Sequence, residues 1–168
     1  MESHIDKLKV LNDFVEERKR RLSEWNEKLI PSIESYLKKV AALDDDLNFE
    51  INDSIVNNQT LILKFSKKPS GWSYNPDCAI NQSDKERGLI FIDDGYLGIS
   101  MSYSGDINAW FSKPTIEGFL FNHEDAVYLD VIDQSDCNYE WLEKTVNRFF
   151  DEMLNWRKND HKRMPIGF

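Results

Sequence analysis

The hydrophobic pattern of this 168-residue sequence changes its period twice, and this change constrains the fold more than any other feature. Near both ends, apolar residues recur every three or four positions, which is the spacing of one helix face. Between these stretches they alternate with polar residues, which is the spacing of a strand with one buried side. The sequence therefore predicts a single α+β domain, residues 1–168, in which N-terminal helices and a C-terminal helix pack on one face of an antiparallel sheet of about five or six strands.

The first helical region is predicted over residues 1–43. Because proline is tolerated in the first turn of a helix but breaks its interior, we expect a kink or a fresh helix start at Pro31. Arg18 interrupts the apolar stripe within a charged run, residues 16–21, which we interpret as a solvated helix face. The stripe consists of Leu8, Leu11, Val15, Leu22, Trp25 and Leu29, and after the proline Ile33, Tyr36, Val40 and Leu43.

The sheet is predicted between residues 47 and 133. Its clearest local signal is Asp94-Gly95 between two apolar runs, which is typical of a two-residue hairpin turn and places Ile92 opposite Leu97. The polar residues 67–87 show no periodicity and are expected to form a long loop. Further strands are expected at 47–51, 61–65, 116–121 and 126–132, with Val127, Leu129 and Val131 of the last one facing inward.

The C-terminal helix is predicted over residues 138–158. Tyr139, Leu142, Val146, Phe149, Met153 and Trp156 would form its buried stripe, and Asp136 or Asn138 its N-terminal cap.

Charge is distributed unevenly along the chain. The formal net charge is −9, and between residues 88 and 143 eleven acidic side chains accompany one cation, Lys113. Such a field repels the nucleic-acid backbone and attracts basic surfaces. The partner that this pattern favours is therefore a protein with a basic surface, with no direct nucleic-acid contact.

Cysteine usage and hydropathy favour a cytoplasmic protein. Cys78 and Cys137 have no metal-binding or redox spacing, and a secreted scaffold that depended on disulfides would carry more cysteines. Neither an apolar leader nor a run of ~18 apolar residues is present, so we expect no contact with a membrane.

Motifs of catalysis are missing from the sequence. It contains no phosphate-binding glycine loop, no nucleophile elbow and no zinc-binding histidine pair. A divalent-metal hydrolase would have to be built on Asp93, Asp94 and Asp130, but turn and strand-end positions already explain these carboxylates. We expect a non-enzymatic protein without a metal or cofactor.

Two pairs of aromatic residues do not fit the periodic pattern. Trp72 and Tyr74 lie in the predicted loop, and Trp110 and Phe111 lie between two turn-like segments, which suggests anchors of a binding surface. The carboxylates that we expect to surround these anchors are Asp93, Asp94, Asp106, Glu117, Glu124, Asp125 and Asp130.

Together these patterns predict an inhibitor-like binding protein whose acidic surface recognises a basic protein, as in immunity proteins, antitoxins or nucleic-acid mimics. An alternative is a structural subunit or chaperone-like module that docks through its N-terminal helices. The sequence does not decide between these two functions, and it gives no oligomeric state.

Overall fold

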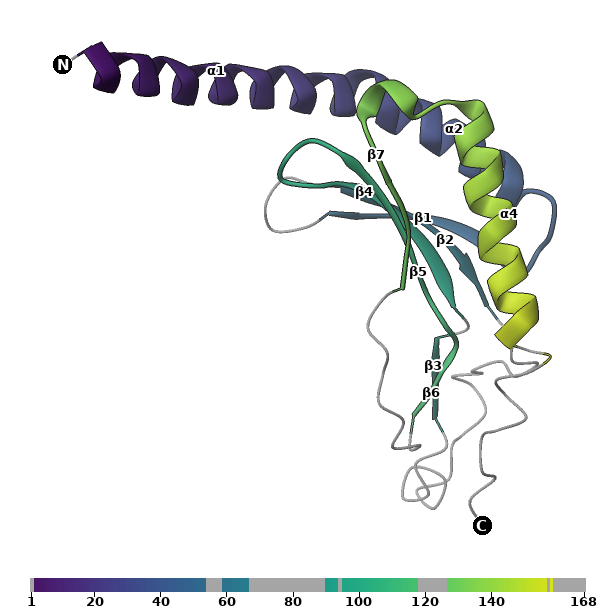
Figure 1. The fold of residues 1–168 in the computed structure, drawn as a ribbon. Helices are drawn as coiled ribbons and strands as arrows, with labels where there is room; N and C mark the ends of the chain where they lie inside the picture. The colour runs from purple at the N-terminus through teal and green to yellow at the C-terminus, as the bar shows by residue number, and fades with distance from the viewer. Residues whose placement is uncertain are drawn as a thin grey trace.

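A computed structural model describes residues 2–53, 59–66, 90–93, 95–117, 127–156 and 158. Figure 1 confirms the predicted α+β fold, with helices from both ends of the chain and an antiparallel sheet between them. The main sheet has five strands in the order β1-β2-β4-β5-β7, and β3 and β6 form a separate two-stranded sheet. The strands are β1 (Leu47–Asp53), β2 (Gln59–Phe65), β3 (Ile90–Asp93), β4 (Tyr96–Met101), β5 (Ile107–Ser112), β6 (Thr115–Glu117) and β7 (Val127–Ile132).

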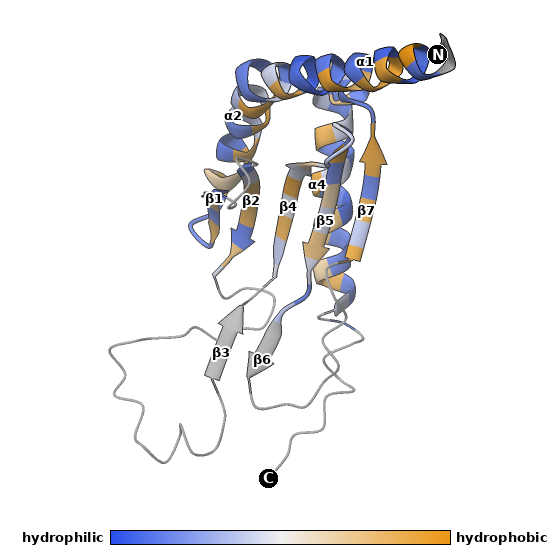
Figure 2. Cartoon of the chain, turned by 90° about the vertical axis from the view of Figure 1, so that its left-hand side faces the viewer, coloured by the Kyte–Doolittle hydropathy of each residue, from blue (hydrophilic) through white to orange (hydrophobic). Residues whose placement is uncertain are grey.

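The N-terminal helical region contains the break that Pro31 predicts. A long helix, α1 (Glu2–Glu24), passes through a π-helical segment (Trp25–Leu29) into α2 (Ile30–Ala41). The N–H of Ile30 donates to the carbonyl oxygen of Trp25, five residues back, so one extra residue is inserted just before the proline. The chain changes direction at this point, as Figures 1 and 2 show.

The last helix, α4 (Tyr139–Asn155), follows a short 3-10 turn (Gln134–Asp136). The predicted cap at Asn138 is confirmed, because its side-chain oxygen accepts a hydrogen bond of 3.0 Å from the backbone N–H of Trp141. The predicted stripe is buried from Leu142 onward, whereas Tyr139 is exposed.

The core lies between one face of the sheet and the helices α2 and α4 (Figure 2). Alternation within β4 is as expected, since Leu97 and Ile99 are fully buried on this face and Ser100 points to the other. The buried side chains include Trp25, Ile33 and Leu37 from the N-terminal region, Leu61, Leu63, Leu97, Ile99, Met101, Ile107 and Phe111 from the sheet, and Val146, Phe149 and Met153 from α4.

The first predicted hairpin is confirmed, and the second is wrong. β1 and β2 pair antiparallel with Leu47 opposite Phe65. By contrast, β4 pairs with β2 and β5, so Leu97 lies opposite Leu63 and Phe111. Ile92 belongs to β3, which pairs with β6 and not with β4. β4 is flanked at both edges by strands whose alternation of apolar and polar residues matches its own. This long-range pairing overrides the local turn signal.

Gly95 nevertheless needs to be glycine. Its φ is 93°, in the left-handed region, and a Cβ at this position would come within 2.7 Å of the Met153 sulfur. The residue therefore redirects the chain between the two sheets where a hairpin turn was expected.

A register shift in β7 changes which of its side chains face inward. Leu129 is buried as predicted and Val127 packs against the core, but Val131 is exposed. The pairing of β5 with β7 is irregular between Ala109 and Trp110, so Ile132 takes the inward position opposite Ile107. The predicted strand 116–121 overlaps β6, and its residues 118–121 lie outside the described part, as do residues 67–87.

Candidate docking surface

The N-terminal half of α1 extends beyond the sheet without packing on the core (Figure 1). The predicted apolar stripe divides at Arg18. After this residue Leu22, Trp25 and Leu29 are buried or packed against the core, whereas the apolar residues that precede it are not. Six large apolar side chains of this half are between 50% and 67% exposed, namely Ile5, Leu8, Val10, Leu11, Phe14 and Val15. We call these six the α1 stripe.

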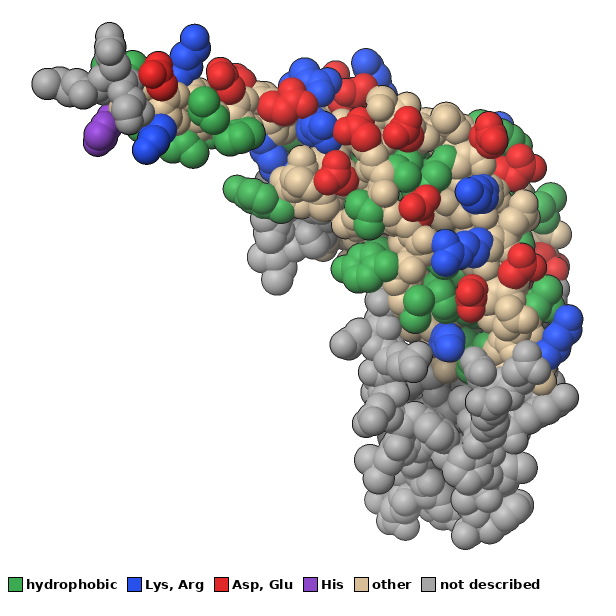
Figure 3. Space-filling view, viewed as in Figure 1, with side chains coloured by type: hydrophobic (Ala, Val, Ile, Leu, Met, Phe, Trp, Pro, Cys, Tyr) green, Lys and Arg blue, Asp and Glu red, His purple; other side chains and the backbone are tan. Residues whose placement is uncertain are grey.

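The α1 stripe is wide. At ~100° per residue, its members spread over roughly 220° of the helix circumference. A coiled-coil seam is narrower, so this width suits burial against more than one neighbouring element. Lys9, Asp13 and Glu16 occupy the opposite side of the helix by the same geometry. Figure 3 shows hydrophobic side chains gathered along the underside of α1, and charged groups above them.

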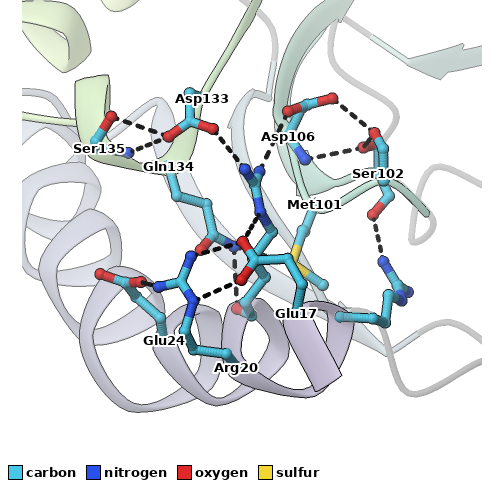
Figure 4. A network of polar contacts seen from close by, with 12 residues as sticks. Glu17, Arg20, Glu24, Met101, Ser102, Asp106, Asp133, Gln134 and Ser135 are labelled. Atoms are coloured by element: carbon cyan, nitrogen blue, oxygen red, sulfur yellow. Dashed lines mark hydrogen bonds and ion pairs between the residues drawn. The ribbon is translucent and has the colours of Figure 1, made fainter. Parts of the chain in front are cut away.

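Arg21 attaches α1 to the rest of the domain, and Figure 4 labels its partners Glu17, Asp106 and Asp133. Its Nη2 donates to Asp133 Oδ2 at 2.8 Å, at the junction of β7 and α4. Its Nη1 lies 3.4 Å from Asp106 Oδ1 at the start of β5, and its Nε donates to Glu17 Oε1 at 2.9 Å within α1. One guanidinium thus joins three separate parts of the chain, and only about a fifth of its surface is exposed (21%).

The charges of this network are set by its hydrogen bonds. Donation from Arg20 and from Arg21 lowers the pKa of Glu17 to about 2. The pKa of Asp133 is also lowered, first by the backbone N–H and hydroxyl of Ser135 and then by Arg21. Both carboxylates are therefore ionised near neutral pH, and the ion pairs with Arg21 persist there.

A second arginine fixes α1 against the turn between β4 and β5. Arg18 donates to the carbonyl oxygens of Ser102 and Tyr103, and its guanidinium carbon lies 4.5 Å from the centroid of the Tyr103 ring. Gly105 in the same turn has a φ of 95° and touches the Arg21 side chain, so a Cβ there would overlap it. The interpretation of residues 16–21 as a solvated face is thus wrong for Arg18 and Arg21, which hold α1 in its projecting position.

The face of the sheet opposite α2 and α4 carries an aromatic row. Trp110 lies across Gly98, where an added Cβ would come within 2.6 Å of the indole ring. Tyr96 meets this indole edge to face, with the ring centroids 5.4 Å apart, and Tyr128 is paired with Trp110 across the strands. Tyr128 is exposed and Trp110 is half-buried. Among the described helices, none packs on this face (Figure 2).

Only part of the predicted site is available for binding. Trp110 reaches the surface of the sheet, but Phe111 points to the opposite face and is only 1% exposed, so the prediction of Phe111 as an anchor is wrong. Adjacent residues of a strand point to opposite sides, which explains the difference. The Asp106 carboxylate is engaged by Arg21 and by the Ser104 hydroxyl, and Asp130 accepts a hydrogen bond of 3.0 Å from the Trp141 indole.

The other predicted residues are not brought together by the described structure. Asp93 lies in β3 and Glu117 in β6, two strands that pair with each other outside the main sheet. Trp72, Tyr74, Asp94, Glu124 and Asp125 lie outside the described residues.

The features that sequence reasoning missed are the α1 stripe and the aromatic row. Ile5, Val10 and Phe14 widen the stripe beyond what one sheet face needs, and this width was a signal visible in the sequence. Tyr96 and Tyr128 carried no comparable signal, because their position beside Trp110 depends on strand pairing.

Within the described ranges, no cluster of three or more His, Cys, Asp or Glu side chains could hold a metal ion. None of the described helices has the length and apolar character that crossing a membrane requires. Comparison of the chain with protein-family models, curated proteins and solved structures finds no match in any of the three.

Proposed function

We propose that this protein is a non-enzymatic binding module that docks to a protein partner through the N-terminal half of α1. One observation carries the proposal: six large apolar side chains are at least half exposed on the half of α1 that projects beyond Arg18 and Arg21, the two residues that attach this helix to the sheet. Scattered exposed apolar residues are normal, but a contiguous apolar face on one helix is typical of an interaction site. This is the subunit-like alternative that the sequence left open.

The energy available at this surface is large enough for specific binding. Complete burial of one such side chain contributes about 1.5–3 kcal/mol. With half to two-thirds of each surface still to be buried, the α1 stripe can contribute roughly 5–10 kcal/mol before the entropic cost of association. An amphipathic helix that lays its apolar face into a groove is a common mode of recognition.

The acidic-surface hypothesis remains a second candidate, because Trp110 is accessible on the open sheet face beside Tyr128. In this mode an immunity- or antitoxin-like protein would steer a basic partner with its carboxylates and anchor it with Trp110. Two of its predicted carboxylates, Asp106 and Asp130, have partners within the fold, which weakens this candidate relative to docking through α1.

A capture experiment with paired variants separates the two candidates. Leu8→Glu with Leu11→Glu places two charges in the α1 stripe. Leu43→Glu with Leu154→Glu makes the same chemical change at two exposed leucines outside α1 and serves as the control. Docking through α1 predicts that partners captured by the wild-type protein are lost only from the stripe variant, at low and high salt alike.

The second candidate predicts a different result in the same experiment. Capture would then survive in the stripe variant, fall in Trp110→Ala and weaken steeply as salt increases. Equal capture by the wild-type protein and the stripe variant would refute docking through α1.

A further inference from the structure

We infer that the outer edge of β1 binds an extended, basic peptide, which joins the main sheet as an additional strand. This site is separate from the α1 stripe, and the inference goes beyond the function proposed above. Three observations support it: the backbone groups that β1 presents at this edge, the contrast with the opposite edge at β7, and the charge of β1.

The backbone of β1 presents hydrogen-bonding groups at one edge of the main sheet, and β7 forms the other edge (Figure 2). The N–H of Ser66 donates to the carbonyl oxygen of Asp46, which fixes the phase of the antiparallel pairing between β1 and β2. Every second residue of β1 therefore bonds to β2, and the backbone groups of Phe49, Ile51 and Asp53 point outward. Within the described residues, no hydrogen bond reaches these outward groups.

The edge at β7 is closed to a further strand. Arg148 of α4 donates to the carbonyl oxygen of Leu129, and the N–H of Val131 donates to Asp130 Oδ1 at 3.0 Å. The irregular pairing of β7 with β5 disrupts this edge further. β1, by contrast, pairs with β2 in unbroken register throughout its length. Among the described strands of the main sheet, β1 alone thus presents a regular, open edge.

The outward groups of β1 identify the kind of partner that fits. They recur at every second residue, roughly 7 Å apart, and an extended chain presents its own N–H and C=O groups at the same spacing. A helix cannot bond to them in this way, because its backbone groups are already paired with one another. Addition of a strand to a sheet edge is a common mode of peptide recognition, in which backbone bonds provide affinity and alternate side chains provide specificity.

The side chains of β1 favour a basic peptide. Glu50 and Asp53 are exposed, and neither forms an ion pair within the described residues. Since β1 contains no cation, a second copy of β1 would meet it with charge of the same sign, whereas cations opposite the two acids would be favourable. Phe49 packs against the core and Ile51 is 40% exposed on the same face, so apolar residues suit the positions opposite these two.

The probe that tests the inference is the peptide acetyl-Lys-Thr-Val-Arg-Val-Thr-amide. In antiparallel orientation its cations lie opposite Asp53 and Glu50, and its valines lie opposite Ile51 and Phe49. Titration into the full chain, followed by NMR, should shift the amide resonances of these β1 residues and leave those of β7 unchanged. Binding should be roughly tenfold weaker when both cations of the peptide are replaced by glutamate. It should also weaken at least tenfold when both valines are N-methylated, because their N–H groups point at β1.

A protein variant provides the matched test of charge. Glu50→Arg should weaken binding of the probe roughly tenfold, whereas Asp13→Arg, the same charge reversal on α1, should leave it unchanged. Both positions are exposed, so circular dichroism should show an intact fold in each variant.

Three results would overturn the inference. The first is an N-methylated peptide that binds as tightly as the probe. The second is the absence of shifts at Phe49 and Ile51 with millimolar peptide, and shifts confined to α1 count as the same result. The third is a change of the β1 amide resonances with protein concentration in the absence of peptide, which would identify a second copy as the occupant. Docking through α1 is decided separately by the capture experiment.

Discussion

Replacement of Arg21 by methionine should weaken the attachment of α1 and lower the stability of the whole domain. Methionine keeps an aliphatic side chain of similar length, so the change mainly removes the guanidinium. Exposed ion pairs contribute about 0.2–1 kcal/mol each. Because Arg21 is largely buried and bridges Asp106 and Asp133, at 3.4 and 2.8 Å, we place each long-range pair at the upper end of that range. The expected loss is about 1–2 kcal/mol, or a fall in Tm of roughly 2–8 °C for a chain of this size.

Urea unfolding followed by circular dichroism measures this loss, with Arg20→Met as the matched control. Arg20 pairs with Glu17 and Glu24 inside the same helix and its side chain is 60% exposed. Because solvent screens its ion pairs, its replacement should change the free energy of unfolding much less than the replacement of Arg21. Equal losses in the two variants would refute the assignment of Arg21 as the link between α1 and the sheet.

The pH dependence of the Arg21→Met effect provides a further check. The pKa values of Glu17 and Asp133 are lowered in the folded protein, so the stabilisation from their ionised forms is present above the usual carboxyl pKa and is lost as the pH falls towards the lowered values. The difference in unfolding free energy between the wild-type protein and Arg21→Met should therefore be constant from pH 6 to 8. It should shrink between about pH 4.5 and 2, where Glu17 regains its proton.

Three other changes test separate parts of the fold. Gly98→Val should push the Trp110 indole off the sheet, which costs roughly 1–3 kcal/mol and alters tryptophan fluorescence, and unchanged stability and emission would contradict the close contact. Burial raises the pKa of Cys137 to about 11, so this thiol should react with iodoacetamide at pH 8 far more slowly in the folded protein than in urea, and equal rates would contradict its burial. Asn138→Ala should destabilise the protein by about 1 kcal/mol in urea unfolding through loss of the α4 cap, and a neutral result would contradict the hydrogen bond to Trp141.

Local sequence signals predicted the elements that depend on local forces. The alternation at 47–51 and 61–65 correctly placed β1 against β2, and the spacing after Asn138 correctly placed α4 and its cap. The Asp94-Gly95 turn failed because pairing of β4 with β2 and β5 is a long-range choice that the turn residues do not encode. For the same reason no local signal showed the bulge that turns Val131 outward.

Less of the candidate site than of the fold could be predicted from the sequence. The adjacent aromatic residues Trp110 and Phe111 suggested a binding surface. Because they are neighbours in the strand β5, they point to opposite faces of the sheet, so Trp110 faces outward and Phe111 enters the core. The periodicity of α1 showed which residues share a face. It could not show that Trp25 packs on its own sheet while Leu8 and Leu11 do not, because periodicity predicts burial without identifying the covering surface.

The most direct test of α1 as a docking surface is amide hydrogen exchange between Ile5 and Val15, measured with and without the protein partner that the capture experiment identifies. A helix without tertiary packing opens at little cost, so its amides exchange quickly in the unbound protein. We predict that protection of these amides rises when the partner is bound, while protection in β2 and β4 stays constant. Exchange between Ile5 and Val15 that is equally fast with and without the bound partner would contradict docking through α1.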